Sequence, residues 1–128
     1  MKLRNIYLTS TSCITLSSVY YSILYNHYIC SFFTFCVFLS SINYWRNPIH
    51  GLRRDIDRVT VIITLNVHII TLKNQQNFIY YLIISGTSVI FYIIAKILKK
   101  NNYIWLSVIS HSMIHISANI ANIILYIN

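Results

Sequence analysis

Acidic residues are almost absent from this chain, which holds 2 Asp or Glu against 10 Lys or Arg in 128 residues. Charged residues of both signs make up 9% of the chain, whereas a soluble domain carries about 25%. So few charges cannot cover a water-facing surface, and 56% of the residues are hydrophobic. The composition therefore excludes an ordinary soluble domain and favours a protein that lies in a lipid bilayer.

Proline and glycine are also rare, and they gather in one stretch. The only proline, Pro48, and one of the 2 glycines, Gly51, lie between residues 40 and 58, together with four arginines and both acidic residues. This stretch separates two long apolar runs. We expect Pro48 and Gly51 to shape a turn there, because glycine can supply a positive φ. If the protein catalyses a reaction, we expect residues of this stretch to take part in it.

Cysteine is scarce as well, and its positions form no recognisable site. Cys13, Cys30 and Cys36 lie inside apolar runs, at no spacing that is typical of metal ligands. We expect them to be small buried apolar residues. They do not indicate a secreted disulfide scaffold.

The net charge of +8 does not predict a nucleic-acid partner. A nucleic-acid-binding domain gathers its basic residues on one face, whereas here they lie at the ends of apolar runs, where membrane topology signals are found. The expected partner is therefore membrane lipid, with no nucleic acid.

Five apolar runs predict an all-α fold, a polytopic transmembrane helical bundle that forms a single domain over residues 1–128. A spanning helix needs about 20 apolar residues. The third run reaches that length if its helix begins near Arg54, which places Asp55 and Asp57 in the first turn, where the helix dipole favours acidic groups. The expected spans lie near residues 6–25, 28–45, 54–72, 78–98 and 103–127.

The distribution of Lys and Arg predicts the orientation. The N-terminus and the second and fourth connections are rich in these residues, whereas the first and third connections and the C-terminus hold Lys73 alone. By the positive-inside rule the N-terminus is cytosolic and the C-terminus external or lumenal. Because Lys2 and Arg4 precede the first run, a signal peptide is an alternative for that run, although no small-residue cleavage site is obvious.

Asp57 and Ser41 are candidate catalytic residues beside the central turn. A carboxylate at the edge of a bilayer needs a partner or water. Asp57 is therefore aimed into the bundle, or else Asp57 and Asp55 pair with Arg53, Arg54 or Arg58 and fix the loop. Ser41 lies on the preceding helix, where the simplest alternative is an ordinary helix hydroxyl.

Three histidines are candidate metal ligands. His111 and His115 are four residues apart and share a helix face, and two imidazoles at this spacing can hold zinc. His68 shares a face with Asp57, and both His68 and His111 are expected about 16 Å further in than Asp57 and Lys100, at about 1.5 Å per residue. The three could form a zinc site with an open fourth position. The alternative is that all three are hydrogen-bonded structural residues, with His68 bonded to Asn66 or a nearby hydroxyl.

Three blocks of the sequence resemble the haemolysin III family. They are Ser-x-x-Tyr within SSINYW (40–45), Arg-x-x-Asp within LRRDIDRVTVI (52–62) and His-x-x-x-His within HSMIHISANIANIILY (111–126). The family belongs to a membrane superfamily with the alkaline ceramidases and the progestin and adipoQ receptors. The blocks cover about a third of the chain, and each is unspecific by itself, so the resemblance depends on their order and placement.

The resemblance implies a zinc site near the cytosolic leaflet and hydrolysis of a lipid amide. Ser41 matches the motif serine, Asp57 the aspartate that holds the zinc-bound water, and His111 and His115 two zinc ligands. The third histidine of the family falls on Trp45, which cannot bind metal, and the family has seven spans.

These departures leave two hypotheses open. In the first, the protein is a reduced metal-dependent lipid hydrolase in which His68 or His50 supplies the third ligand and the lipid substrate enters from the bilayer. In the second, it is a non-catalytic membrane protein without metal, in which the polar stripes hold the bundle together or bind a partner.

Overall fold

The computed structural model describes residues 2–127, and helices make up nearly all of this part of the chain. No strand occurs between residues 2 and 127. The expectation of an all-α bundle is therefore confirmed. The helices are α1 (Leu3–Ser12), α2 (Thr15–Leu24), α3 (Tyr28–Arg46), α4 (Leu52–Leu72), α5 (Phe78–Lys100) and α6 (Ile104–Tyr126).

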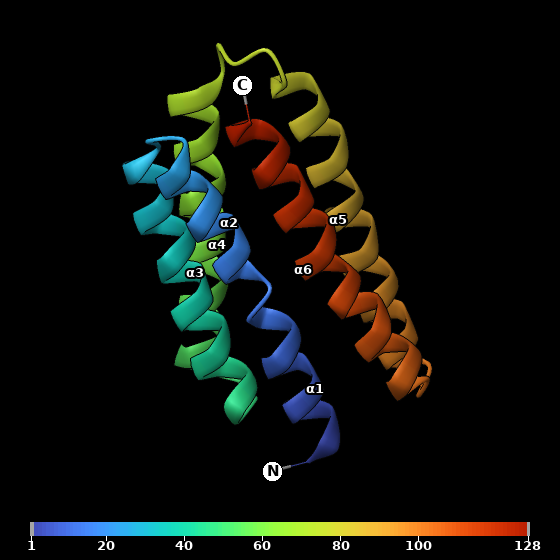
Figure 1. The fold of residues 1–128 in the computed structure, drawn as a ribbon. Helices are drawn as coiled ribbons and strands as arrows, with labels where there is room; N and C mark the ends of the chain where they lie inside the picture. Colours follow the sequence, from blue (N-terminus) through green and yellow to red (C-terminus); the bar gives the residue numbers. More distant parts are fainter. Residues whose placement is uncertain (1, 128) are drawn as a thin grey trace.

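The helices form rods that run between the same two ends of the bundle (Figure 1). The rods are α1 continued by α2, and then α3, α4, α5 and α6 in turn. The N-terminus and the connections after α3 and α5 lie at the lower end of Figure 1, while the C-terminus and the other two long connections lie at the upper end. The arginine-rich turn and the Lys99–Lys100 pair therefore lie at the lower end, which we call the basic end.

The first expected span, 6–25, is two helices rather than one. The hydroxyls of Thr9, Ser10 and Ser12 donate to carbonyls four residues earlier, at 2.7–2.9 Å. Side-chain bonds of this kind compete with the helix ladder and bend helices. At Cys13 and Ile14 the backbone N–H groups bond three residues back instead of four, so α1 ends there and α2 starts in a new direction. The hydroxyl-rich sequence explains the interruption.

Three helices, α3, α5 and α6, are long and apolar enough to cross a membrane. The chain is therefore a membrane protein. α1 and α2 have 10 residues each and are individually too short. α4 has 21 residues, but its first two turns carry arginines and both acidic residues, which lower its hydropathy.

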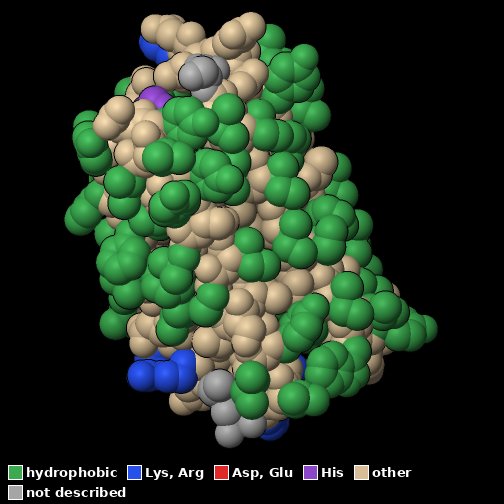
Figure 2. Space-filling model, in the orientation of Figure 1, with side chains coloured by type: hydrophobic (Ala, Val, Ile, Leu, Met, Phe, Trp, Pro, Cys, Tyr) green, Lys and Arg blue, Asp and Glu red, His purple; other side chains and the backbone are tan. Residues whose placement is uncertain are grey.

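The bundle places apolar side chains outside and small polar side chains inside. Ile70 and Ile79 are 71% and 69% exposed, whereas Ser18, Ser22 and Thr34 are at most 1% exposed. Hydrophobic side chains cover the face seen in Figure 2 along its whole length, and Lys and Arg side chains show mainly at its lower end. Small hydroxyl residues between helices allow close packing in lipid. This distribution matches a bilayer environment, because in water the apolar exterior would be unfavourable.

The buried apolar cluster lies toward the end of the bundle opposite the basic end. It contains Cys30, Leu72, Tyr81, Ala121, Leu125 and Tyr126. Of the cysteines expected to be buried, only Cys30 is; Cys13, in the turn between α1 and α2, is exposed, and Cys36 on α3 is half-buried. Tyr126, the last residue of α6, is fully buried.

Candidate functional site

Asp57 and Ser41 are in direct contact. The Asp57 carboxylate on α4 accepts hydrogen bonds from Ser41 Oγ at 2.7 Å and from Ser40 Oγ at 2.9 Å, both on α3. The turn between α3 and α4 positions Asp57 relative to Ser41 and contains Gly51. The φ of Gly51 is +145°, the positive φ expected from the sequence. A non-glycine residue is strained in that conformation. The turn thus aims Asp57 toward α3, into the bundle.

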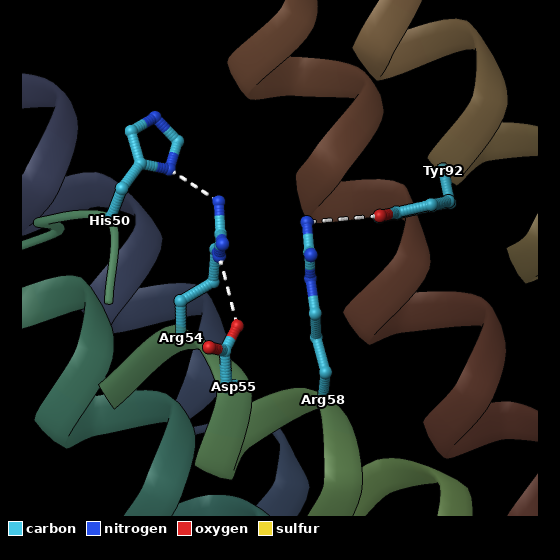
Figure 3. A network of polar contacts seen from close by, with 5 residues as sticks. All are labelled: His50, Arg54, Asp55, Arg58 and Tyr92. Carbon is cyan, nitrogen blue, oxygen red and sulfur yellow. Dashed lines mark hydrogen bonds and ion pairs between the residues drawn. The ribbon is translucent and has the colours of Figure 1, made fainter. Parts of the chain in front are cut away.

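The arginines around Asp57 have other partners, which Figure 3 shows. Arg54 Nε donates to Asp55 at 3.3 Å, and Arg54 Nη1 lies 2.6 Å from His50 Nδ1. Arg58 Nη2 donates to the Tyr92 hydroxyl of α5 at 3.3 Å. Within residues 2–127, Arg54–Asp55 is the only ion pair. Of the alternative in which the acidic residues pair with neighbouring arginines, the Arg54–Asp55 pair is found, whereas Asp57 forms no ion pair within the described residues. His50 is engaged by a guanidinium.

Trp45 connects the serine–aspartate contact to the two histidines. Its ring lies edge-on to His111, with centroids 4.6 Å apart, and the rings of His111 and His115 are 5.5 Å apart. Ser41 and Trp45 are one turn apart on α3 and therefore share a face. Ser41, Trp45, Asp57, His111 and His115 thus form a chain of contacts that runs from α4 through α3 to α6, and we call these residues the tryptophan cluster.

Two nitrogens of the tryptophan cluster are buried without a partner. Trp45 Nε1 and His115 Nε2 form no hydrogen bond within the described chain. A buried polar group without a partner destabilises the fold by about 1–3 kcal/mol. These two nitrogens therefore make the cluster the least satisfied polar region in the interior.

The residues of the tryptophan cluster do not fit a zinc site with three protein ligands. A catalytic zinc takes three such ligands and leaves one position open. Over the range that the structure covers, no three side chains of His, Cys, Asp or Glu come close enough to hold one ion. Trp45 occupies the place beside His111 where the resemblance puts the third histidine, and an indole N–H has no free lone pair to give a metal.

His68 lies in a different part of the bundle. Its Nδ1 is 2.7 Å from the Thr64 carbonyl oxygen, and its Nε2 contacts the Tyr126 hydroxyl. Tyr126 is 15 residues after His111 on α6, about 22 Å along the helix at about 1.5 Å per residue. The structure does not bring His68 to the other two histidines. The expectation of a common depth placed Asp57 and Lys100 at one level, but α4 and α6 are displaced along each other.

Tyr126 is the interior residue that sequence reasoning missed. Its hydroxyl contacts His68 and lies 3.3 Å from Thr34 Oγ1, so it joins α3, α4 and α6. A signal was present: His111, His115, Asn119 and Tyr126 follow one another at helical spacing, so the polar stripe continues to the end of α6.

Asn119, the next residue of the stripe, joins α6 to α2. Its Oδ1 accepts a hydrogen bond from Ser18, and its Nδ2 donates to the His115 carbonyl at 2.6 Å and to Thr15 Oγ1 at 3.5 Å. Both Ser18 and Asn119 are at most 3% exposed. This contact fixes the second half of the interrupted rod against α6.

No protein-family model matches the chain, and neither a curated protein nor a solved structure matches it. The resemblance to the haemolysin III family therefore stays a prediction, based on the three sequence blocks.

Proposed function

We propose that this is a multi-pass membrane protein of five spans with a cytosolic N-terminus, in which buried polar side chains hold the helices together and catalyse no reaction. α1 with α2 counts as one interrupted span and α4 as another. The topology is supported by the basic end, where the N-terminus and the two Lys- and Arg-rich connections gather (Figure 1). Irregular backbone inside a bilayer is tolerated where protein surrounds it, and α1 and α2 both pack on α3 and α6.

The observation that carries the structural role is the engagement of His68. Both of its ring nitrogens have partners, and the Tyr126 hydroxyl extends the contact to Thr34. A histidine that binds a metal or moves a proton needs a ring nitrogen free for that purpose. Bonds between helices recur at Asn119 with Ser18, and Ser88 Oγ lies 2.7 Å from Ser117 Oγ between α5 and α6. Hydrogen bonds between membrane helices stabilise their association.

The test is to measure zinc content and thermal stability of the protein purified in detergent. The proposal expects no stoichiometric zinc and the same melting temperature with and without a chelator. A metal bound to the native state alone would raise its stability. One zinc per chain, together with a lower melting temperature in chelator, would overturn the proposal.

A second candidate is a reduced relative of the metal-dependent lipid amide hydrolases. It is favoured by one observation: Ser41, Asp57, His111 and His115, named by the resemblance, are linked through Trp45 in one chain of contacts across three helices. In this candidate Ser41 holds the Asp57 carboxylate in position to orient a water molecule. It also needs a third metal ligand, which no described residue brings to the two histidines.

The discriminating experiment is turnover of a fluorescent lipid amide by purified protein in lipid nanodiscs. The hydrolase candidate expects turnover that is lost in the double variant His111→Ala, His115→Ala and retained in His27→Ala, a control on the far side of the bundle. Turnover that persists in the double variant, or no turnover by the unaltered protein, would exclude it.

A further inference from the structure

An open pocket lies at the basic end between the start of α1 and the end of α3. Its volume is about 760 Å³, and its walls come from two separate segments of chain. The lining residues are Lys2, Arg4, Asn5, Arg46, Asn47 and Pro48. Three cationic side chains therefore share one pocket, which we call the N-terminal pocket.

No carboxylate neutralises these three cations. The whole chain has only 2 acidic residues, of which Asp55 pairs with Arg54 and Asp57 accepts hydrogen bonds from Ser40 and Ser41. The first turn of α1 contributes no acidic residue either, and its unpaired backbone N–H groups add positive partial charge. The positive charge of the pocket can only be balanced by a group from outside the chain.

Asn5 is a further polar residue of the pocket wall. It lines the N-terminal pocket, is 8% exposed, and its side-chain Oδ1 has no hydrogen-bond partner in the described chain. A buried amide without a partner is unfavourable. An asparagine amide carries two N–H donors, so its Nδ2 can donate to a phosphate oxygen in the pocket, while Oδ1 is shielded from it.

The surroundings of the pocket are suited to a lipid. Leu3 follows Lys2 in the chain and is 69% exposed, and Ile49 follows Pro48 and is 61% exposed. The pocket therefore combines cationic walls with neighbouring apolar side chains at the level where headgroups meet acyl chains. Anionic lipids are concentrated in the cytoplasmic leaflet, which the basic end faces if the N-terminus is cytosolic.

We propose that the N-terminal pocket binds the phosphate of an anionic phospholipid headgroup. Lys2, Arg4 and Arg46 receive the phosphate, and Asn5 donates an amide N–H to it. Guanidinium groups suit phosphate oxygens because two parallel N–H donors match their geometry. The bound lipid ties the first turn of α1 to the end of α3, which no direct ion pair in residues 2–127 does.

The test measures binding of phosphatidylglycerol to the protein purified in neutral detergent, by native mass spectrometry and by thermal shift. Phosphatidylcholine controls for general lipid binding, and soluble glycerol phosphate separates a lipid from a free phosphate ester. The unaltered protein is expected to bind phosphatidylglycerol and to melt at a higher temperature with it, with no response to the two controls. An equal response to glycerol phosphate would overturn the assignment to a lipid.

The deciding variant is Arg4→Gln, Arg46→Gln, with Arg53→Gln, Lys100→Gln as its matched control. Both variants remove two positive charges from the basic end, but Arg53 and Lys100 are exposed and do not line the pocket. The pocket variant is expected to bind phosphatidylglycerol about 30-fold more weakly, from about 1 kcal/mol per basic residue. Equal weakening in both variants would overturn the proposal, because it would show attraction to net charge alone.

A variant that keeps every charge guards against misfolding of the double variant. Asn5→Ala is expected to weaken binding about 5-fold, the equivalent of one net hydrogen bond, without lowering the melting temperature of the lipid-free protein, because the amide oxygen that it removes has no partner there. Unchanged affinity in Asn5→Ala would contradict the role of the buried amide and with it the site as proposed.

Discussion

Replacing Tyr126 with Phe removes one hydroxyl from the interior and leaves the ring in place. That hydroxyl contacts His68 Nε2 and lies 3.3 Å from Thr34 Oγ1. His68 and Thr34 are each 1% exposed, so neither can turn to solvent for a new partner. The substitution therefore leaves polar groups on two other helices without their shared partner.

Two general magnitudes set the size of the effect. Hydrogen bonds between membrane helices contribute about 0.6 kcal/mol on average and up to about 1.7 kcal/mol. A buried polar group left without a partner is unfavourable by about 1–3 kcal/mol. Two groups lose their partner, and a penalty at the lower end of that range for each means that Tyr126→Phe should lower the free energy of unfolding by about 2 kcal/mol. For a chain of this length that corresponds to a melting temperature lower by about 5–8 °C.

The assay is thermal unfolding in detergent, followed by circular dichroism. Tyr103→Phe is the matched control, because Tyr103 immediately precedes the same helix and is 58% exposed; it is expected to melt with the unaltered protein. His68→Phe tests the coupling: once His68 is gone, Tyr126→Phe should lower stability by less than it does alone. A Tyr126→Phe variant as stable as its control, or two strictly additive effects, would refute the reasoning.

Three further predictions test the turn, the aspartate contact and the topology. Gly51→Ala should lower stability by about 1–3 kcal/mol because its conformation is nearly exclusive to glycine, whereas Gly86→Ala, in α5 with open space at its Cβ, should raise it by about 0.5–1 kcal/mol; chemical unfolding of both variants compares them. Ser41→Ala should lower the melting temperature by the equivalent of about 1.5 kcal/mol, since it removes a bond to a carboxylate, and equal stability would show that Ser40 alone holds Asp57. A cysteine placed in the 73–77 connection should react with a membrane-impermeant thiol reagent from outside intact cells while one in the 47–51 turn should not, and the reverse labelling would contradict the cytosolic N-terminus.

Hydropathy along the chain determined which segments become helices. The expected runs 28–45, 78–98 and 103–127 correspond to α3, α5 and α6 within two residues at each end, because an apolar run of about 20 residues in lipid satisfies its backbone only as a helix. The interruption of the first run depends on its Ser and Thr hydroxyls. Their bonds to backbone carbonyls depend on side-chain rotamers, which a pattern of apolar residues does not reveal.

The positions of helices along one another were decided only by the tertiary structure. His68 and His111 were expected at one depth, but α4 places His68 beside Tyr126, while Trp45 reaches His111 from α3. Sequence periodicity gives the face of a helix on which a residue lies, yet says nothing of how far one helix is displaced past its neighbour. That displacement results from the packing of small side chains and from bonds such as Ser18–Asn119, which join residues far apart in the chain.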